Sequence, residues 1–483
     1  MTSNDIEKPT NGLQLKAIWI FVGISFLVLF LSSSLRHGLF QSSSWDLGIF
    51  DQAVYLISQG EPPISSFLGF HILSDHVAFI LYPISILYWI HPDVHWLLMV
   101  QALALALGIY PVFGLALFAG LTSFQGMIVG VVYLLYPAIF NINLFDFHPE
   151  VIALPSIIWM VLAARSKLIR QFCLALVITL SCKAVLSLTV AAMGLWLITC
   201  EKRKWYGIIA LVSGIGWFLI ATQIIIPAFG SEASSIARHV NRYKDLGNSF
   251  SDILLNVLIK PYMILNRIFS VETLEYLALL FSPVVYVFTT KNLRPLLQLI
   301  PAAPALAMNI LSSENSQRNL VHQYSLPIVP FILLVVISYL QSISNFPSLL
   351  PKLFGYRVYK IILCWAILAF LVLSRLSFFF GSYYNSIDTL QSTREAIAKI
   401  HSNESVLTTA EIAPHLTHRS SINFTNTDSS KNVDKFRYVL LNTRHPGWMS
   451  SKQSATDLVN QLSNSNQFQL NYQKDDVYLF VRN

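Results

Sequence analysis

The sequence predicts a mainly α-helical bundle that crosses a membrane many times, followed by a small α/β domain. Of the 483 residues, 54% are hydrophobic and only 12% are charged, and the mean hydropathy is +0.57. Such a composition is typical of polytopic membrane proteins. The chain becomes more polar after residue 384, so the expected domains are 1–384 and 385–483.

Eleven apolar stretches predict transmembrane helices, although several fall short of the roughly 20 residues that a helix needs to cross the hydrocarbon core. The first lacks a cleavage pattern of small residues, so we expect it to remain as a membrane anchor. Helix bundles tolerate the prolines in these stretches when other groups satisfy the freed carbonyls. In chain order, the stretches are 17–36, 94–118, 124–141, 150–164, 168–182, 185–200, 206–227, 274–290, 294–311, 324–342 and 359–380.

A further apolar stretch, 77–90, is shorter and contains Pro83. If it does not cross, the N-terminus and the basic short loops share one side, with 13 Lys and Arg against 3 acids. The positive-inside rule places that side in the cytoplasm of a multi-pass cell-membrane protein. We therefore expect 77–90 to form an external juxtamembrane helix, 251–270 to form a second interfacial helix, and the C-terminal domain to be external.

The C-terminal domain alternates helix-like and strand-like patterns. Residues 389–400 and 455–462 read as helices. Residues 405–409, 438–442, 467–472 and 476–481 read as strands, and the last two are joined by a turn at 474–476. These patterns predict a small α/β domain of mixed layers.

Acidic residues follow the first apolar stretch. Asp46 and Asp51 lie in the segment Trp45–Gln52, and Asp75 with His76 follows before the next span. Ionisable groups beside a membrane-embedded cavity are candidates for function, because charge is costly in apolar surroundings. A carboxylate there suits general-base work on an attacking hydroxyl. Solvated loop acids are the alternative.

A second group, Asp146, His148 and Glu150, stands where one apolar stretch ends and the next begins. Carboxylate oxygen and imidazole nitrogen are ordinary ligands of divalent metals, so these residues are a candidate site for Mg or Mn. A simpler interpretation is a helix start, with Pro149 in the first turn and Glu150 favoured by the helix dipole.

Basic side chains suit a phosphate leaving group. Lys183 stands between two apolar stretches without an acidic neighbour in sequence, and Arg238 and Arg242 lie in the long external stretch 230–272. A lysine that extends to the headgroups, or a solvated loop against anionic lipid, would explain the same residues. His322 and Tyr324 belong to a polar run that enters an apolar stretch, compatible with the lining of a cavity.

These segments resemble a known family. The chain is similar, over nearly its whole length, to an uncharacterised family of bacterial polytopic membrane proteins that is grouped by fold with the GT-C glycosyltransferases. The residues that carry the resemblance are Trp45-Asp46-Leu47-Gly48-Ile49-Phe50-Asp51-Gln52, Asp75-His76, Phe147-His148-Pro149-Glu150, His322-Gln323-Tyr324 and Pro414-His415-Leu416.

The resemblance implies a GT-C-like bundle and transfer of a sugar from a polyprenyl-phosphate donor on the external face. It implies a catalytic acid in the first external loop, which is Asp46 here, with Asp51 as second choice. One departure is that relatives place a Lys-acid-acid run where this chain has Lys183-Ala184-Val185, which points to a changed substrate or a lost activity. The residues expected to bind substrate are Asp75, His76, Lys183, Arg238, Arg242, His322 and Tyr324.

The expected function is therefore that of an integral-membrane glycosyltransferase. Its expected partners are membrane lipid, the polyprenyl-phosphate sugar donor and an unknown acceptor, and no nucleic acid. The alternative is a non-catalytic membrane protein that binds a lipid or a protein through its external domain. A transporter fits less well, because transporters place ionisable groups near the midplane of repeated halves, whereas these acids gather at one surface and no internal repeat is visible.

Overall fold

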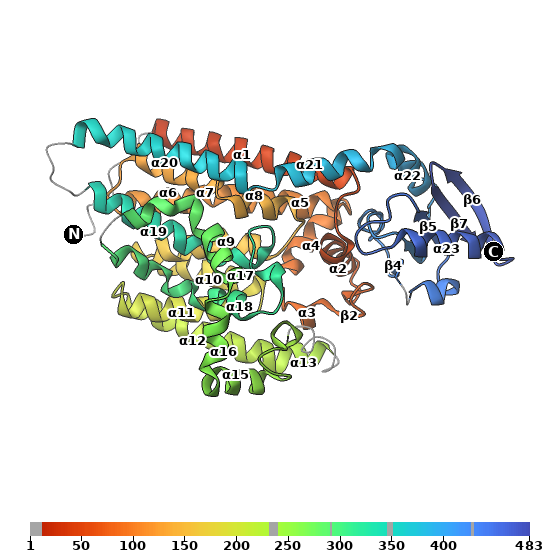
Figure 1. The fold of residues 1–483 in the computed structure, drawn as a ribbon, viewed down its shortest axis with the longest axis horizontal. Helices are drawn as coiled ribbons and strands as arrows, with labels where there is room; N and C mark the ends of the chain where they lie inside the picture. The colour runs from red at the N-terminus through yellow and green to blue at the C-terminus, as the bar shows by residue number, and fades with distance from the viewer. Residues whose placement is uncertain (1–11, 231–239, 290–291, 345–350, 427–428) are drawn as a thin grey trace.

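The computed structural model describes residues 12–230, 240–289, 292–344, 351–426 and 429–483. The chain is mainly helical, as the sequence predicted. Figure 1 shows long helices that run along the longest axis of the molecule and a small domain with a sheet at one end. The segments around α2 (Ile49–Ser58) and α4 (Leu81–Ile90) lie between these two parts.

The bundle is built from helices of unequal length, because proline interrupts several of them by removing a backbone donor. Pro295 and Pro301, for example, lie in the short 3₁₀-helix η6 (Arg294–Ala302). The other described helices, in chain order, are α1 (Gly12–Gly38), η2 (Ser44–Gly48), α3 (Ile72–Asp75), α5 (His95–Leu107), α6 (Ile109–Phe118), α7 (Ser123–Leu134), α8 (Pro137–Leu144), α9 (Glu150–Arg165), α10 (Ile169–Cys182), α11 (Leu186–Thr199), α12 (Lys204–Ile220), η3 (Ala221–Ile225), α13 (Ile226–Phe229), η4 (Asn241–Tyr243), α15 (Phe250–Ile259), α16 (Pro261–Ile268), α17 (Val271–Phe281), η5 (Ser282–Thr289), α18 (Ala303–Leu311), η7 (Asn315–Gln317), η8 (Gln323–Ser325), α19 (Val329–Ser344), α20 (Pro351–Leu373) and α21 (Leu376–Asn385).

Each of the eleven predicted stretches is largely helical. Among the described residues, four segments are long and apolar enough to cross a membrane: Lys16–Gly38, His95–Phe118, Lys204–Phe229 and Val271–Thr289. The pair α7 and α8, bent by 44°, makes a fifth if it counts as one span. The structure thus supports a protein with several membrane-spanning helices, while the number eleven and the orientation of the termini stay predictions.

The two predicted interfacial segments are also helical. Residues 81–90 of the stretch 77–90 form α4, which lies at the end of the bundle that faces the C-terminal domain (Figure 1), whereas 77–80 are not helical. Residues 251–270 contain most of α15 and all of α16; Leu258 of α15 is 72% exposed, and Phe269, which directly follows α16, is 70% exposed. Their apolar exposure is compatible with the predicted interfacial position, which stays a prediction.

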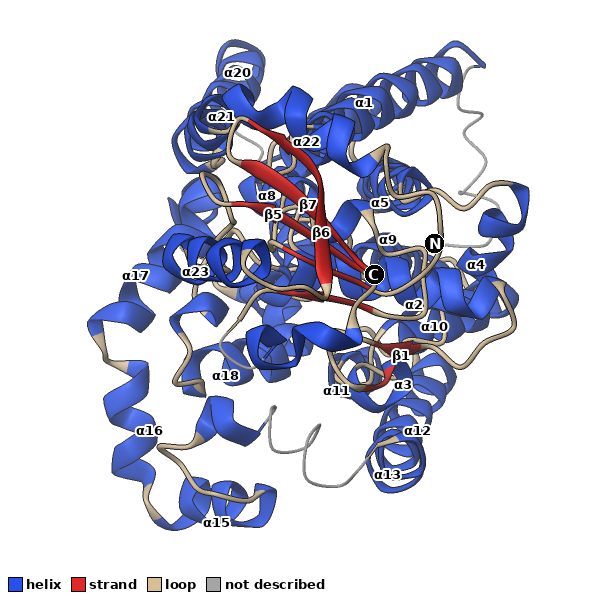
Figure 2. Cartoon of the chain, turned by 90° about the vertical axis from the view of Figure 1, so that its right-hand side faces the viewer, coloured by secondary structure: helices blue, strands red, loops and turns tan. Residues whose placement is uncertain are grey.

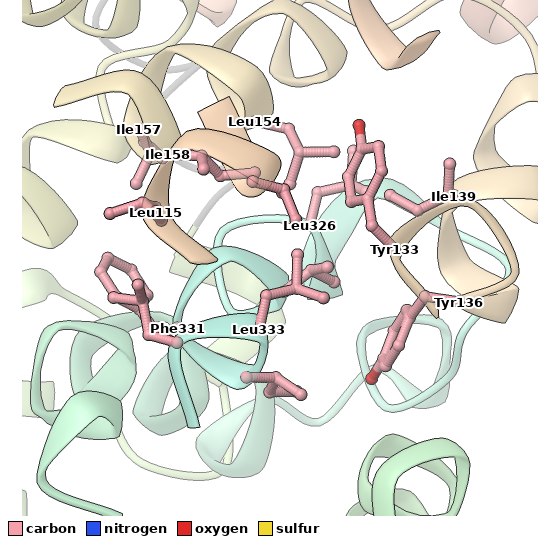
Figure 3. Packing of buried hydrophobic residues seen from close by; sticks show 14 of the residues in the cluster. Leu115, Tyr133, Tyr136, Ile139, Leu154, Ile157, Ile158, Leu326, Phe331 and Leu333 are labelled. Carbon is pink, nitrogen blue, oxygen red and sulfur yellow. The ribbon is translucent and has the colours of Figure 1, made fainter. Parts of the chain in front are cut away.

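The core of the bundle is packed by aliphatic and aromatic side chains from α6 to α9 and from α19 (Figure 3). The buried hydroxyls of Tyr133 and Tyr136 are satisfied, because they donate to the carbonyls of Leu105 and Leu280, each at 2.6 Å. Gly108 permits the first of these contacts, since a Cβ there would lie 2.2 Å from the Tyr133 hydroxyl oxygen. Such close packing gives this end of the molecule a rigid frame.

The C-terminal domain carries a five-stranded sheet in the described part of the chain, in the order β4-β3-β5-β7-β6 (Figure 2). The strand β3 is parallel to both neighbours, and β7 is antiparallel to both of its neighbours. All four predicted strands and both predicted helices are confirmed, and β4 is an additional short strand. The elements are α22 (Leu390–Ile397), β3 (Val406–Thr408), β4 (Ile422–Phe424), β5 (Tyr438–Asn442), α23 (Lys452–Ser463), β6 (Phe468–Lys474) and β7 (Val477–Arg482).

The C-terminal domain does not have a core entirely of its own. One hydrophobic cluster joins side chains of α2 and α4, such as Phe50 and Tyr88, to side chains of the domain, such as Leu416 and Leu440. The helix α21 also runs across the expected boundary at 384. The boundary therefore stays a prediction, and the shared core holds the domain against the end of the bundle.

Candidate active site

Asp46 lies in η2, the single turn of π-helix between α1 and α2. The side chain of Ser43 caps this turn by accepting a hydrogen bond from the backbone N–H of Trp45 at 3.1 Å. The Asp46 Oδ1 lies 3.4 Å from the Nε2 of His148, and the Asp46 side chain is 19% exposed. A short irregular turn thus leaves a carboxylate partly exposed beside a buried histidine.

His148 is held in a defined orientation. Its ring is 1% exposed, stacks on Phe145 with centroids 5.6 Å apart, and its Nδ1 lies 3.2 Å from the carbonyl oxygen of Asp146. Because a carbonyl only accepts, Nδ1 carries a proton and Nε2 faces Asp46. Burial lowers the pKa of His148, but the hydrogen bond and the charge of Asp46 outweigh burial, so this pKa lies above its ordinary value.

The same contact favours the ionised form of Asp46 over its protonated form. Burial raises the pKa of Asp46, yet the hydrogen bond and charge of His148 and the charge of His322 lower it below its ordinary value. Asp46 is therefore ionised at neutral pH. An ionised and partly exposed carboxylate, held by one imidazole, can accept a proton from a bound hydroxyl.

Asp146 fixes the segment that leads to Asp46. Its Oδ1 lies 2.7 Å from Nη1 of Arg36 at the end of α1, and its Oδ2 accepts from the backbone N–H of Ser43 at 2.7 Å. The backbone of Asp146 has φ +97°, a strained conformation for a residue with a side chain. Burial raises the pKa of Asp146 to about 6, against the opposing charge of Arg36. With only 2% of its side chain exposed, Asp146 positions η2 rather than facing a substrate.

Glu150 and Lys183 form a buried ion pair. The Lys183 Nζ lies 2.5 Å from Glu150 Oε1, and their side chains are 10% and 5% exposed, respectively. Glu150 is the first residue of α9, and Lys183 directly follows α10, the helix that packs on α9. The partner that Lys183 lacks among its sequence neighbours therefore comes from the preceding helix. A cation already neutralised in this way is poorly suited to a phosphate.

The three residues expected to bind a metal are engaged separately. Asp146 pairs with Arg36, His148 faces Asp46, and Glu150 pairs with Lys183. Within the described ranges no group of three or more His, Cys, Asp or Glu side chains could hold a metal ion. The described geometry does not provide an Mg or Mn ligand set, and metal binding stays a prediction.

Asp51 is closed off from solvent. Its side chain is 0% exposed; the hydroxyls of Tyr88 and Thr417 donate to it, and the Nε2 of His418 lies 3.2 Å from its Oδ2. Burial raises the pKa of Asp51, but the charge and hydrogen bond of His418 and the hydroxyl donors lower it overall. Asp51, which was expected as the second choice for the catalytic acid, thus links α2 and α4 to the C-terminal domain through these contacts.

The carboxylate of Asp75 contacts the ring Nδ1 of His76 at the end of α3. Burial lowers the pKa of His76 to about 4, and the Asp75 charge opposes that effect. The carbonyl of His76 accepts from the N–H of Ala184 at 3.0 Å, which brings this pair beside the Glu150–Lys183 pair. Asp75, His76, Glu150 and Lys183 therefore form one buried polar layer.

A row of rings leads from His148 to an arginine. Phe145, which stacks on His148, contacts His322 with ring centroids 4.4 Å apart, and His322 lies 6.3 Å from Tyr324. The guanidinium of Arg242 lies 5.4 Å from the Tyr324 ring centroid. Within the described residues no carboxylate pairs with Arg242. A series of ring contacts thus connects three of the residues predicted from sequence, His322, Tyr324 and Arg242, to His148. Arg238 lies outside the described residues.

Sequence reasoning missed Arg36, Thr417 and His418. Arg36 had a usable signal, because a basic residue at the external end of the first stretch opposes the predicted charge bias. Thr417 and His418 directly follow the motif Pro414-His415-Leu416, which was noticed only as part of the resemblance. Their contact with Asp51 crosses more than 360 residues of sequence, and no local pattern predicts it.

The fold resembles that of solved membrane transferases. One is ArnT from Cupriavidus metallidurans bound to undecaprenyl phosphate, with a TM-score of 0.56 at 12% identity over 96% of this chain and 98% of ArnT. The apo state of ArnT gives a TM-score of 0.51 at 10% identity over the same shares. The arabinofuranosyltransferase AftD from Mycobacteria gives 0.53 at 14% identity over 97% of this chain and 40% of AftD.

The chain and these solved structures share one overall fold. Residues 36–479 match the family model of predicted membrane proteins DUF2079, and the chain belongs to that family. No curated protein matches the sequence. At these identities the solved structures show a shared fold, and they do not by themselves assign the reaction.

Proposed function

We propose that this protein is an integral-membrane glycosyltransferase that takes a sugar from a polyprenyl-phosphate donor, with Asp46 as the catalytic base. The observation that carries the proposal is the difference in exposure among the acids that the sequence singled out. Asp46 keeps 19% of its side chain exposed and faces the ring of His148. The side chains of the others are at most 5% exposed, and each is closed by a partner; they are Asp51, Asp75, Asp146 and Glu150.

The proposed reaction needs one proton acceptor. A hydroxyl oxygen of the acceptor forms a bond to the anomeric carbon of the donor sugar, and the bond from that carbon to the phosphate oxygen breaks with its electron pair. The hydroxyl proton goes to an oxygen of Asp46, and polyprenyl phosphate leaves as an anion. His148 keeps the carboxylate in place, and its orientation is fixed by Phe145 and the Asp146 carbonyl.

The leaving phosphate needs a cation that is not already neutralised. Arg242 meets this condition better than Lys183, because its guanidinium stacks over Tyr324 and pairs with no carboxylate of the described residues. A guanidinium can bind phosphate oxygens through two parallel hydrogen bonds. The similarity to ArnT, which was crystallised with undecaprenyl phosphate, supports a lipid phosphate as the carrier.

The test of the base is transfer of a labelled sugar from undecaprenyl-phosphate donors by the full chain in nanodiscs, with an extract of the native membrane as acceptor source. Asp46→Asn keeps the size of the side chain and removes the basic oxygen, so the rate should fall on the order of a hundredfold to ten-thousandfold. Asp93→Asn is the matched control, since Asp93 is 45% exposed and also faces a histidine, His95. Equal rates in wild type and Asp46→Asn would remove Asp46 from catalysis. A wild-type chain that binds donor but transfers no sugar would favour the non-catalytic alternative.

The test of the phosphate contact is the donor KM of Arg242→Gln. Losing a charged hydrogen bond should raise KM roughly ten- to a hundredfold, with a smaller change in kcat. Arg267→Gln is the matched control, because Arg267 is a neighbouring arginine that already pairs with Asp245. If Arg267→Gln raises KM as much as Arg242→Gln, the effect is a general loss of positive charge.

A further inference from the structure

Histidines gather where the bundle meets the C-terminal domain. His37 lies at the end of α1, His95 begins α5, and the third, His415, ends the turn Ala413–His415 of the C-terminal domain. The rings of His37 and His415 stack, with centroids 3.9 Å apart and 17° between their planes, and the His95 ring meets that of His37 nearly at right angles at 5.6 Å. With His418, four of the chain's 12 histidines stand at this junction. Because histidine changes its charge near neutral pH, the junction is a candidate pH sensor.

The surroundings of the His415 ring suit its neutral form. One ring nitrogen is hydrogen-bonded to the backbone of His37, while the other, Nε2, is buried and has no hydrogen-bond partner in the described part of the chain. A proton on Nε2 would add a buried donor without an acceptor, and a positive charge against a second imidazole. Phe40, whose ring centroid lies 4.0 Å from that of His415, offers no polar group. Burial lowers the pKa of His415 to about 3, although the hydrogen bond to His37 opposes that effect.

The charged groups around the stack do not offset such a proton. Arg394 of α22 donates to a backbone carbonyl of α1 at 2.8 Å, and its charge and that of a protonated His95 both oppose a charge on His415. The acids of the junction have other partners. Asp93 Oδ1 lies 2.6 Å from Nδ1 of His95, and Asp51 accepts from two hydroxyls and faces another histidine. A charged stack would therefore be unpaired.

The other histidine of the C-terminal domain responds to pH in the opposite sense. The Nε2 of His418 lies 3.2 Å from Asp51 Oδ2. Burial lowers the pKa of His418, but the Asp51 charge and hydrogen bond raise it above its ordinary value; Asp93 adds to that rise and Arg419 opposes it. This contact is therefore complete below about pH 6.5 and weakens at higher pH. The stack, whose His415 has a lowered pKa, is most stable above about pH 6.5 and weakens as pH falls.

We propose that the stacked histidines are an acid-sensitive latch: below about pH 6.5 a proton enters the stack, and the turn Ala413–His415 leaves α1 and η2. The opening is local, because most side chains of the shared hydrophobic cluster lie outside the turn. When opening takes up one proton, the equilibrium constant for closing falls about tenfold for each pH unit below that value.

The latch has a consequence for the candidate active site. The turn Ala413–His415 packs on η2, which carries Asp46. Opening of the turn therefore removes a support of the segment that holds the Asp46 carboxylate. If the proposed transferase function holds, acid lowers the rate through this loss of support. The opening itself does not require that function, and it is measured without catalysis.

Hydrogen exchange of the full chain in nanodiscs, followed by mass spectrometry between pH 5 and 8, tests the latch. After correction for the intrinsic pH dependence of exchange, the protection of the peptide that contains Ala413–His415 should fall about tenfold for each pH unit below about 6.5. Protection of α19, in the core of the bundle, should stay constant, which separates local opening from unfolding. His415→Phe keeps an aromatic ring in the stack and takes up no proton, so its turn should stay protected at pH 5. His37→Phe makes the same test from the other ring, and it applies also where His415→Phe does not fold.

His91→Phe is the matched control, because His91 is an exposed histidine that directly follows α4 at the same end of the bundle. It should keep the acid response of the wild type, and so should His418→Gln. Constant protection of the wild-type turn from pH 8 to pH 5, or an equal loss of protection in α19, would overturn the inference. So would an acid response of the wild-type size in His415→Phe or His37→Phe. Loss of the acid response in His418→Gln or His91→Phe would place the sensor outside the stack.

Discussion

Asp46 and Asp51 stand five residues apart, and their surroundings are opposite. Asp46 sits in an irregular turn, is 19% exposed and meets a single imidazole at 3.4 Å. Asp51 sits on α2, is 0% exposed and accepts from two hydroxyls and faces a histidine, two of these three groups coming from the C-terminal domain. The carboxylate of Asp46 is partly exposed to solvent, and that of Asp51 holds α2, α4 and the C-terminal domain together. The same residue type in the same segment therefore has two different environments.

The largest expected effect on stability comes from Asp51→Ala. It leaves the hydroxyls of Tyr88 and Thr417 and the His418 ring without their acceptor, so it should destabilise the fold by about 3–5 kcal/mol. Asp46→Ala should cost less than about 1 kcal/mol, because water can replace the one contact. Denaturant unfolding of both variants in detergent measures the difference. If both variants lose the same free energy of unfolding, Asp51 does not stabilise the fold more than Asp46 does.

The variant Lys183→Met tests whether the buried polar layer that contains Glu150 and Lys183 stabilises the fold. It leaves Glu150 as an uncompensated buried charge, so it should destabilise the protein by about 3–5 kcal/mol. The double variant Lys183→Met, Glu150→Gln should recover most of that loss, as measured by thermal unfolding. If Lys183→Met unfolds like the wild type and instead raises the donor KM, the phosphate role predicted from sequence is supported.

A smaller effect is expected from replacing one donor at the closed site. Thr417→Val is close in size and removes a single hydroxyl from Asp51, so it should cost about 1–3 kcal/mol. Limited proteolysis at the junction and denaturant unfolding measure it. Thr456→Val, on the exposed face of α23, is the control, since its hydroxyl only donates to the Lys452 carbonyl at 2.9 Å. If Thr417→Val is as stable as this control, the hydrogen bond from Thr417 to Asp51 does not stabilise the junction.

The smallest effect is the pH dependence of the closed site. Burial lowers the pKa of His418, but the Asp51 charge and hydrogen bond raise it above its ordinary value, whereas the pKa of Asp51 is lowered. The contribution of charged His418 to the free energy of unfolding is therefore complete below about pH 6.5, and it is lost as pH rises through the raised pKa of His418. The Asp51 contribution is lost as pH falls below about 4. Melting temperatures of wild type and His418→Gln should differ most between these limits; a constant difference across pH 4–9 would exclude the ion pair.

Much of the fold could be predicted because it depends on local pattern. Apolar stretches near membrane-spanning length marked the helices, and alternation with turn residues marked β3, β5, β6 and β7. The strand β4, Ile422–Phe424, was missed, because it gains its place by pairing with the distant strand β3. The count of crossings was harder to predict, because prolines divide apolar stretches into short helices such as η6 and α18.

The sequence by itself determined that this is a helical membrane protein with a polar domain after residue 384, and which acids carry functional potential. Only the tertiary structure decided among those acids. Arg36 reaches Asp146, Lys183 reaches Glu150, and His418 reaches Asp51 across 110, 33 and 367 residues. Whether a carboxylate is open or closed depends on partners brought by distant helices and by the C-terminal domain. Local sequence records the charge of a side chain, while burial and partners follow from packing of the whole chain.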